Sequence, residues 1–172
     1  MLVHLTDAKN SKSIAAGGLR GQKTQIRTPD GTLAISKAVH CMPVLPDYFI
    51  THQWLRELKR RGMRTLVGVY IRLPSDETVW VGYFNKEHRQ MSLGDAIHLI
   101  AYEADAQGFE IIIPHSILKA DIHKVRGVSQ KVGWRFFPKA HTTKPFCGCK
   151  FCTGGEIKAK RFRERLEQSR KS

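Results

Sequence analysis

The sequence predicts an α+β domain with a short C-terminal appendage. Apolar strand patterns follow one another with only a few helical segments between them, so the order lacks the regular alternation of a doubly wound sheet. The chain has 172 residues, of which 41% are hydrophobic. That length fits one domain with a small addition, and that composition is sufficient for a buried core.

The first half is expected to combine strands with short helices. Leu2 to Thr6 alternates apolar and polar residues, as strands do. Asp7 can cap a helix that the Gly17-Gly18 pair ends. The expected elements are a strand over 2–6, a helix over 7–16, a loop over 18–31, a strand over 33–41 and a helix over 46–60.

The second half contains the most hydrophobic strand pattern, Phe109 to Ile113, between Gly108 and Pro114. Ser92 and Asp95 form a capping box at the start of a helix. The expected elements are strands over 65–73 and 78–84, a helix over 92–105, a strand over 109–113, a short element over 117–125, a strand over 132–137 and a charged helix over 156–168.

The charge of the chain favours a polyanionic partner. Lys and Arg number 29 against 15 Asp and Glu, a formal net charge of +14. Such an excess attracts nucleic acid through its phosphates, although a solvated basic surface is the simpler alternative. No apolar run is long enough to cross a membrane, and the N-terminus lacks the pattern of a signal peptide. We therefore expect a cytoplasmic protein that does not enter membranes.

A cysteine cluster marks the appendage. His141, Cys147, Cys149 and Cys152 lie close together in a segment that contains Pro145 and is followed by the Gly154-Gly155 pair. Three thiolates and one imidazole form a complete tetrahedral ligand set for Zn²⁺, so the ion is expected to be structural. Free cysteines or a redox pair are the alternatives. We divide the chain into a core over 1–138 and a zinc-binding loop with a basic helix over 139–172.

Polar residues inside apolar strands are the candidates for chemistry. Glu110 interrupts the most hydrophobic strand, and a carboxylate there must face a cleft or have a partner, unless its strand lies at a solvent-exposed edge. His4 interrupts the first strand, where a histidine bonded to backbone is the alternative. Thr6 follows it, and Arg20 lies in a basic loop suited to phosphate or simply to solvent.

Three segments in this order resemble ADP-ribosyltransferases, and in particular DarT-type toxins, which modify bases in DNA. Val3-His4-Leu5-Thr6-Asp7 with the helix end Ile14 to Leu19 is similar to their first strand and helix. Val39-His40-Cys41-Met42 resembles their second conserved strand. Gln107 to Pro114, with Glu110 inside it, is similar to the stretch that bears their catalytic glutamate.

The resemblance implies a split, mixed or antiparallel sheet around a cleft for NAD. His4 would contact the ribose of NAD beside Thr6, Arg20 would contact a phosphate, and Glu110 would be the catalytic residue. His40 and Cys41 stand where one subgroup of the family has an aromatic residue. The cysteine cluster is no part of the family pattern.

These inferences favour an NAD-dependent ADP-ribosyltransferase that acts on nucleic acid, DNA rather than RNA, in the manner of a toxin with an antitoxin or another partner protein. A non-catalytic, zinc-stabilised nucleic-acid-binding protein is the alternative. A third hypothesis is a nuclease or another transferase that uses His4 with either His115 or His123.

Overall fold

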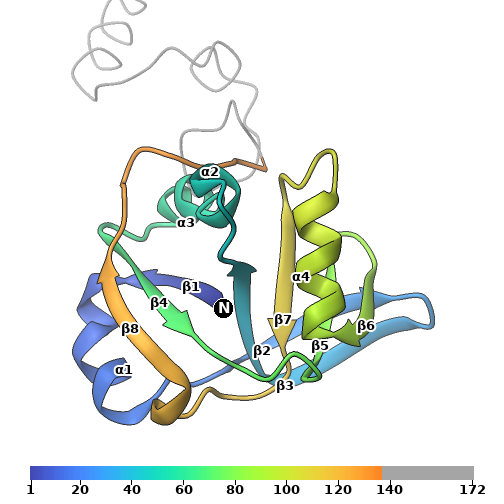
Figure 1. Cartoon of the computed structure of the whole chain (residues 1–172), viewed down its shortest axis with the longest axis horizontal. Helices are drawn as coiled ribbons and strands as arrows, with labels where there is room; N and C mark the ends of the chain where they lie inside the picture. The colour runs from blue at the N-terminus through green and yellow to red at the C-terminus, as the bar shows by residue number, and fades with distance from the viewer. Residues whose placement is uncertain (137–172) are drawn as a thin grey trace, which may run out of the picture.

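The fold is built on an antiparallel sheet in the order β6-β5-β7-β3-β1-β4-β8, with β2 paired to β3 outside that series. A computed structural model describes residues 1–136 (Figure 1). Its strands are β1 (Leu2–Asp7), β2 (Gln22–Thr28), β3 (Gly31–Pro43), β4 (Leu66–Ile71), β5 (Thr78–Tyr83), β6 (His88–Ser92), β7 (Phe109–Ile113) and β8 (Ile122–Gly127). Its helices are α1 (Ser11–Gly17), α2 (Tyr48–Thr51), α3 (Leu55–Arg60), α4 (Leu93–Tyr102) and the short 3₁₀ turns η1 (Ala8–Asn10) and η2 (Lys119–Asp121).

The α+β class is confirmed, and within residues 1–136 the sheet is antiparallel rather than mixed. All pairs of neighbouring strands there run antiparallel. The expected strands over 2–6, 33–41, 65–73, 78–84 and 109–113 are present, and the capping-box helix is α4. Ser92 accepts a hydrogen bond from the Asp95 amide at 3.1 Å, as the capping box requires.

Two predictions for the first half were wrong. The loop expected over 18–31 contains β2, which buries only Ile26 and therefore shows no regular apolar alternation. The helix expected over 46–60 is divided into α2 and α3. The chain turns between them at Gln53, whose fully buried side chain donates to the carbonyl of Ala106 at 2.9 Å.

Two further predictions differ in the last part of the described chain. The strand expected over 132–137 is absent from residues 132–136, where the Trp134 amide donates to the Gln53 carbonyl instead of to a neighbouring strand. The short element over 117–125 consists of η2 followed by the start of β8, which pairs with β4. Strand β6 was not predicted, because its polar sequence buries only His88.

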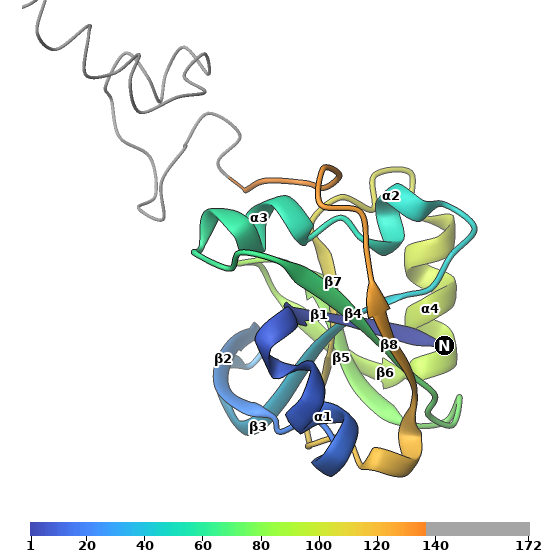
Figure 2. The same ribbon diagram turned by 90° about the vertical axis from the view of Figure 1, so that its left-hand side faces the viewer.

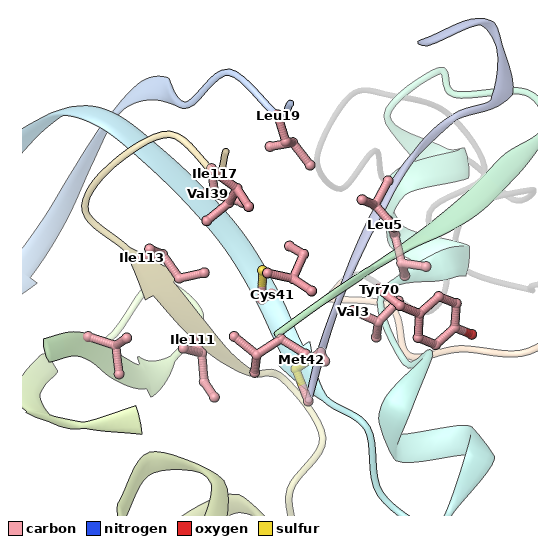
Figure 3. Packing of buried hydrophobic residues seen from close by; sticks show 14 of the residues in the cluster. Val3, Leu5, Leu19, Val39, Cys41, Met42, Tyr70, Ile111, Ile113 and Ile117 are labelled. Atoms are coloured by element: carbon pink, nitrogen blue, oxygen red, sulfur yellow. The ribbon is translucent and has the colours of Figure 1, made fainter. Parts of the chain in front are cut away.

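The core lies between the sheet and its helices. Helix α4 packs on β5 and β6, while α2 and α3 lie together at one end of the sheet (Figures 1 and 2). Figure 3 shows side chains from β1, β3, β4 and β7 gathered in the main cluster, among them Val3, Cys41, Met42, Tyr70 and Ile111. Within residues 1–136, the helices are all too short or too polar to cross a membrane.

Strands β1 and β3 separate soon after they meet. They pair only at Leu2 with Pro43 and at Val3 with Met42. Beyond those pairs β1 continues along β4, while β3 continues along β7. The sheet therefore opens between two strands that each carry a histidine near the last pair. His4 is one position past it on β1, and His40 is two positions past it on β3.

Candidate active site

A cavity of about 750 Å³ lies at this opening between β1 and β3. Its volume falls within the range of about 300–1,000 Å³ that is typical of ligand pockets. Strands β1, β2, β3 and β7, helix α1 and the segment from Trp54 to Met63 contribute to its wall. Its polar and charged lining residues are His4, Thr6, Asn10, Ser13, Arg20, Gln22, Lys23, Thr24, His40, Arg61 and Glu110.

The four described residues that the resemblance selects all line this one cavity: His4, Thr6, Arg20 and Glu110. Thr6 is 6% exposed, and its hydroxyl accepts a hydrogen bond from the Asn10 side chain at 3.1 Å. Arg20 is exposed at the rim. The fold thus brings together residues from β1, from the segment after α1 and from β7, which are remote from one another in the sequence.

His4 is fixed by the backbone of the neighbouring strand. Its Nδ1 lies 2.8 Å from the carbonyl oxygen of His40, and since a carbonyl only accepts, this nitrogen carries the proton. The pKa of His4 is lowered to about 4, mainly by burial and also by the nearby His40 ring, while the hydrogen bond to the His40 carbonyl opposes the shift. His4 is therefore neutral at pH 7, with a lone pair on Nε2 that can accept a hydrogen bond from a hydroxyl.

Glu110 is an ionised carboxylate inside the protein. It is 7% exposed, and its Oε2 accepts a hydrogen bond from His40 Nδ1 at 2.8 Å. Burial by itself opposes ionisation, but hydrogen bonds and charge from His40 and His88 outweigh it and lower the pKa of Glu110 to about 2. Because each carboxylate oxygen has two lone pairs, Glu110 can still accept a further hydrogen bond from a ligand.

His88 approaches Glu110 from the other side. It is 2% exposed, and its Nε2 lies 3.3 Å from Glu110 Oε1, although without the alignment of a good hydrogen bond. Its Nδ1 donates to the carbonyl of Lys86 at 3.1 Å. Both ring nitrogens of His88 therefore face oxygens, Nδ1 that of the Lys86 carbonyl and Nε2 that of the Glu110 carboxylate.

Gly82 allows these residues to meet. It pairs with His88 on β6 and with Glu110 on β7, so it lies between them in the sheet. A Cβ atom at this position would come within 2.5 Å of the Glu87 carbonyl oxygen and 2.9 Å of His88 Cγ. Only glycine lets the His88 ring cross β5 closely enough to reach the carboxylate.

An aromatic cluster closes one end of the cavity. Trp54 and Phe84 belong to its lining, and their ring centroids lie 5.3 Å apart in an edge-to-face arrangement. Trp134 packs on Trp54 with 4.8 Å between centroids, which agrees with a packing role for both. The Arg61 guanidinium lies 4.9 Å from the centroid of the Phe84 ring. The cavity wall therefore includes aromatic surface and a cation in addition to its histidines and Glu110.

The remaining sequence candidates do not join this site. His115 Nε2 lies 3.1 Å from Glu77 Oε1, and His123 lies beside Arg72. Neither histidine lines the cavity. The third hypothesis, which pairs His4 with one of them, therefore has no second histidine at this site. The predicted zinc ligands His141, Cys147, Cys149 and Cys152 lie outside the described residues. Between residues 1 and 136, no cluster of at least three His, Cys, Asp or Glu side chains is arranged to hold a metal ion.

His40 and His88 are the functional candidates that sequence reasoning did not select. His40 interrupts the apolar strand Val39-His40-Cys41 in the same way that His4 interrupts β1, so the criterion that found His4 applies to it as well. His88 lies in the polar segment Lys86-Glu87-His88-Arg89, which gives no local sign of burial.

Comparison of the chain with protein-family models, with curated proteins and with solved structures found no match. The function proposed below therefore depends on the geometry of the cavity and on the chemistry of its residues.

Proposed function

We propose that the protein is an NAD-dependent ADP-ribosyltransferase that modifies nucleic acid, with DNA favoured over RNA. The observation that carries this proposal is the convergence of His4 and Glu110, with Thr6 and Arg20, on one cavity of ligand size. These are the residues that the resemblance to DarT-type enzymes selects. Had His4 and Glu110 lain on opposite faces of the sheet, the proposal would have no site.

The lining of the cavity suits a dinucleotide. Arg20 and Lys23 supply cations for a pyrophosphate, and Thr6, Ser13 and the neutral His4 offer hydrogen-bonding groups for a ribose. Trp54 and Phe84 supply aromatic surface for a flat heterocycle. A ligand with phosphates, sugars and planar rings matches this combination of groups better than a purely apolar or a purely anionic one.

Glu110 is suited to stabilise the transition state of ADP-ribosyl transfer. The bond between C1′ of the ribose and the nicotinamide nitrogen breaks, and its electron pair leaves with the nicotinamide. Positive charge then develops on the ribose, and a fixed carboxylate in a water-poor site stabilises that charge. The lowered pKa of Glu110 keeps the carboxylate charged at neutral pH.

The acceptor follows from the charge of the chain. A net charge of +14 attracts a polyanion, and Arg20 and Lys23 place part of that charge at the cavity itself. The predicted zinc site at His141, Cys147, Cys149 and Cys152 would anchor the basic segment that follows it, as a structural element of the acceptor-binding region.

The test is incubation with NAD labelled in its adenylate half, together with single-stranded DNA, duplex DNA or RNA. The proposal expects release of nicotinamide and transfer of label to DNA. Glu110→Gln should lower both by about 100-fold or more. Glu103→Gln, at an exposed position after α4, is the matched control and should behave as wild type.

The alternative, a non-catalytic nucleic-acid-binding protein, gives a different outcome in the same experiment. The net charge of +14 is the observation in its favour. It expects salt-dependent binding to DNA or RNA that survives substitution of both His4 and Glu110, with no release of nicotinamide.

A further inference from the structure

We propose that His40 is the catalytic base that removes the proton from the acceptor, and that Glu110 holds it in the correct orientation. This inference rests on the proposed ADP-ribosyl transfer and assigns a role in it to a residue that the sequence resemblance does not select. It is carried by the hydrogen bonds around His40 and by the position of its ring in the cavity.

The hydrogen bond to Glu110 sets the tautomer of His40. Nδ1 of His40 lies 2.8 Å from Glu110 Oε2, and an ionised carboxylate can only accept, so Nδ1 carries the proton. In the neutral imidazole the lone pair then resides on Nε2. A buried carboxylate orients the histidine of hydrolytic triads through the same kind of bond.

The ring of His40 is much more open to a ligand than its carboxylate partner is. The His40 side chain is 44% exposed and lines the cavity, while the Glu110 side chain is 9% exposed. The backbone of His40 is held on two sides, by pairing with Ile112 on β7 and by the bond from His4 to its carbonyl. His40 thus combines a fixed main chain with a side chain that a substrate can reach.

Glu110 is poorly suited to accept the proton itself. Its two oxygens face His40 and His88, and at neutral pH a carboxylate with a pKa near 2 is a weak base. The two roles in the reaction are therefore divided. Glu110 provides the negative charge that faces the developing cation, and His40 provides the lone pair.

Proton transfer to His40 accompanies the attack of the acceptor on NAD. The acceptor, an N–H or O–H group of the nucleic acid, attacks C1′ as the bond to nicotinamide breaks. Its proton passes to Nε2 of His40, and the electron pair of the N–H or O–H bond stays on the acceptor atom. The imidazolium that forms is stabilised by Glu110 and releases its proton to water, which restores the neutral ring.

The other ionisable groups at this site surround that pair. His4 contacts the main chain of His40 from β1, and His88 contacts Glu110 from β6. Arg20, Lys23 and Arg61 line the same cavity. These charged and ionisable groups share one cavity with the reacting atoms, so all of them enter the pH dependence of the transfer rate.

The experiment compares the wild-type chain with His40→Gln and with His98→Gln, an exposed histidine on α4 that serves as the matched control. The transfer rate to DNA is measured from pH 5 to 9, with NAD affinity measured separately. We expect His40→Gln to lose about 100-fold or more in transfer and to lose the rising limb of the pH profile, with NAD affinity unchanged. His98→Gln should keep both the wild-type transfer rate and the rising limb of the pH profile.

Rescue provides a second test. Added imidazole should restore part of the transfer by His40→Ala and none by Glu110→Gln. A His40→Gln variant that keeps the wild-type rate and pH limb would overturn the role of His40 while leaving the transferase intact. A wild-type protein that releases no nicotinamide would overturn the proposed function, and the role of His40 with it.

Discussion

Substitution of Glu110 by Gln should change how the stability of the protein depends on pH. The pKa of Glu110 falls from its ordinary value of 4.5 to about 2 in the folded protein, because the hydrogen bonds and charge of two histidines overcome the opposing effect of burial. At about 1.4 kcal/mol for each pKa unit, the ionised side chain contributes about 3 kcal/mol to the free energy of unfolding at pH 7. Gln cannot ionise and lacks this contribution.

The sign follows from the direction of the shift. A carboxyl group whose pKa is depressed by folding stabilises the protein above its unfolded pKa, and this stability is lost as the pH falls from 4.5 towards 2. Between pH 7 and pH 3.5 the wild type should therefore lose about 1.4 kcal/mol relative to Glu110→Gln. Urea unfolding of both proteins across this range measures the difference.

Glu103→Gln, which removes an exposed carboxylate, should track the wild type at every pH. A constant difference between wild type and Glu110→Gln from pH 7 to pH 3.5 would refute the reasoning. It would mean that the carboxylate does not ionise more readily in the folded chain, and that the contacts to His40 and His88 do not hold it charged.

Three further predictions concern the fold, the cavity and the metal. Gln53→Leu should lower the free energy of unfolding by about 2–5 kcal/mol, measured by urea, because it leaves the Ala106 carbonyl and the Gly108 amide without their partner; an unchanged value would contradict this. The pKa of His4 is lowered to about 4, so stability should fall by about 1–3 kcal/mol as the pH drops from 6.5 towards 4, and His4→Gln should flatten that slope. Purified protein should contain about one zinc ion per chain by elemental analysis. Chelation of the zinc should weaken DNA binding, measured by fluorescence anisotropy, without abolishing nicotinamide release. Chelation without any effect on stability or binding would show that the cysteines play another role.

The elements predicted correctly from the sequence are those in which the pattern of apolar residues reflects which side chains are buried. Strand β7 is apolar apart from Glu110 because Ile111, Ile112 and Ile113 are fully buried, and α4 begins at a capping box. Strand β2 shows no such pattern, since Ile26 is its one buried residue and β3 is the one named strand with which it pairs. Its hairpin did leave one local signal, Pro29-Asp30-Gly31, which is typical of a turn between strands.

The helix over 46–60 was predicted as one element because apolar spacing cannot show where a chain must turn. The break at Gln53 satisfies buried groups near β7, including the Ala106 carbonyl. The strand over 132–137 was predicted from its aromatic residues. In the fold Trp134 packs against Trp54 instead of joining the sheet. In both cases tertiary partners far away in the sequence decided the local structure.

Three of the four residues in the histidine and glutamate network could be found from local sequence. His4 and Glu110 each stand out as a polar residue in an apolar strand, and His40 meets the same criterion. His88 does not, because its burial depends on Gly82 pairing with it on one side and with Glu110 on the other. The order of strands across the sheet, which no local pattern specifies, is what brings the four residues together.

The most direct test of the central claim is the transfer of labelled ADP-ribose from NAD to DNA by the wild-type chain and by Glu110→Gln. The proposed function predicts that the wild type releases nicotinamide and labels DNA. It also predicts that Glu110→Gln lowers both rates by about 100-fold or more. Absence of nicotinamide release by the wild type, or equal rates in the two proteins, would contradict it.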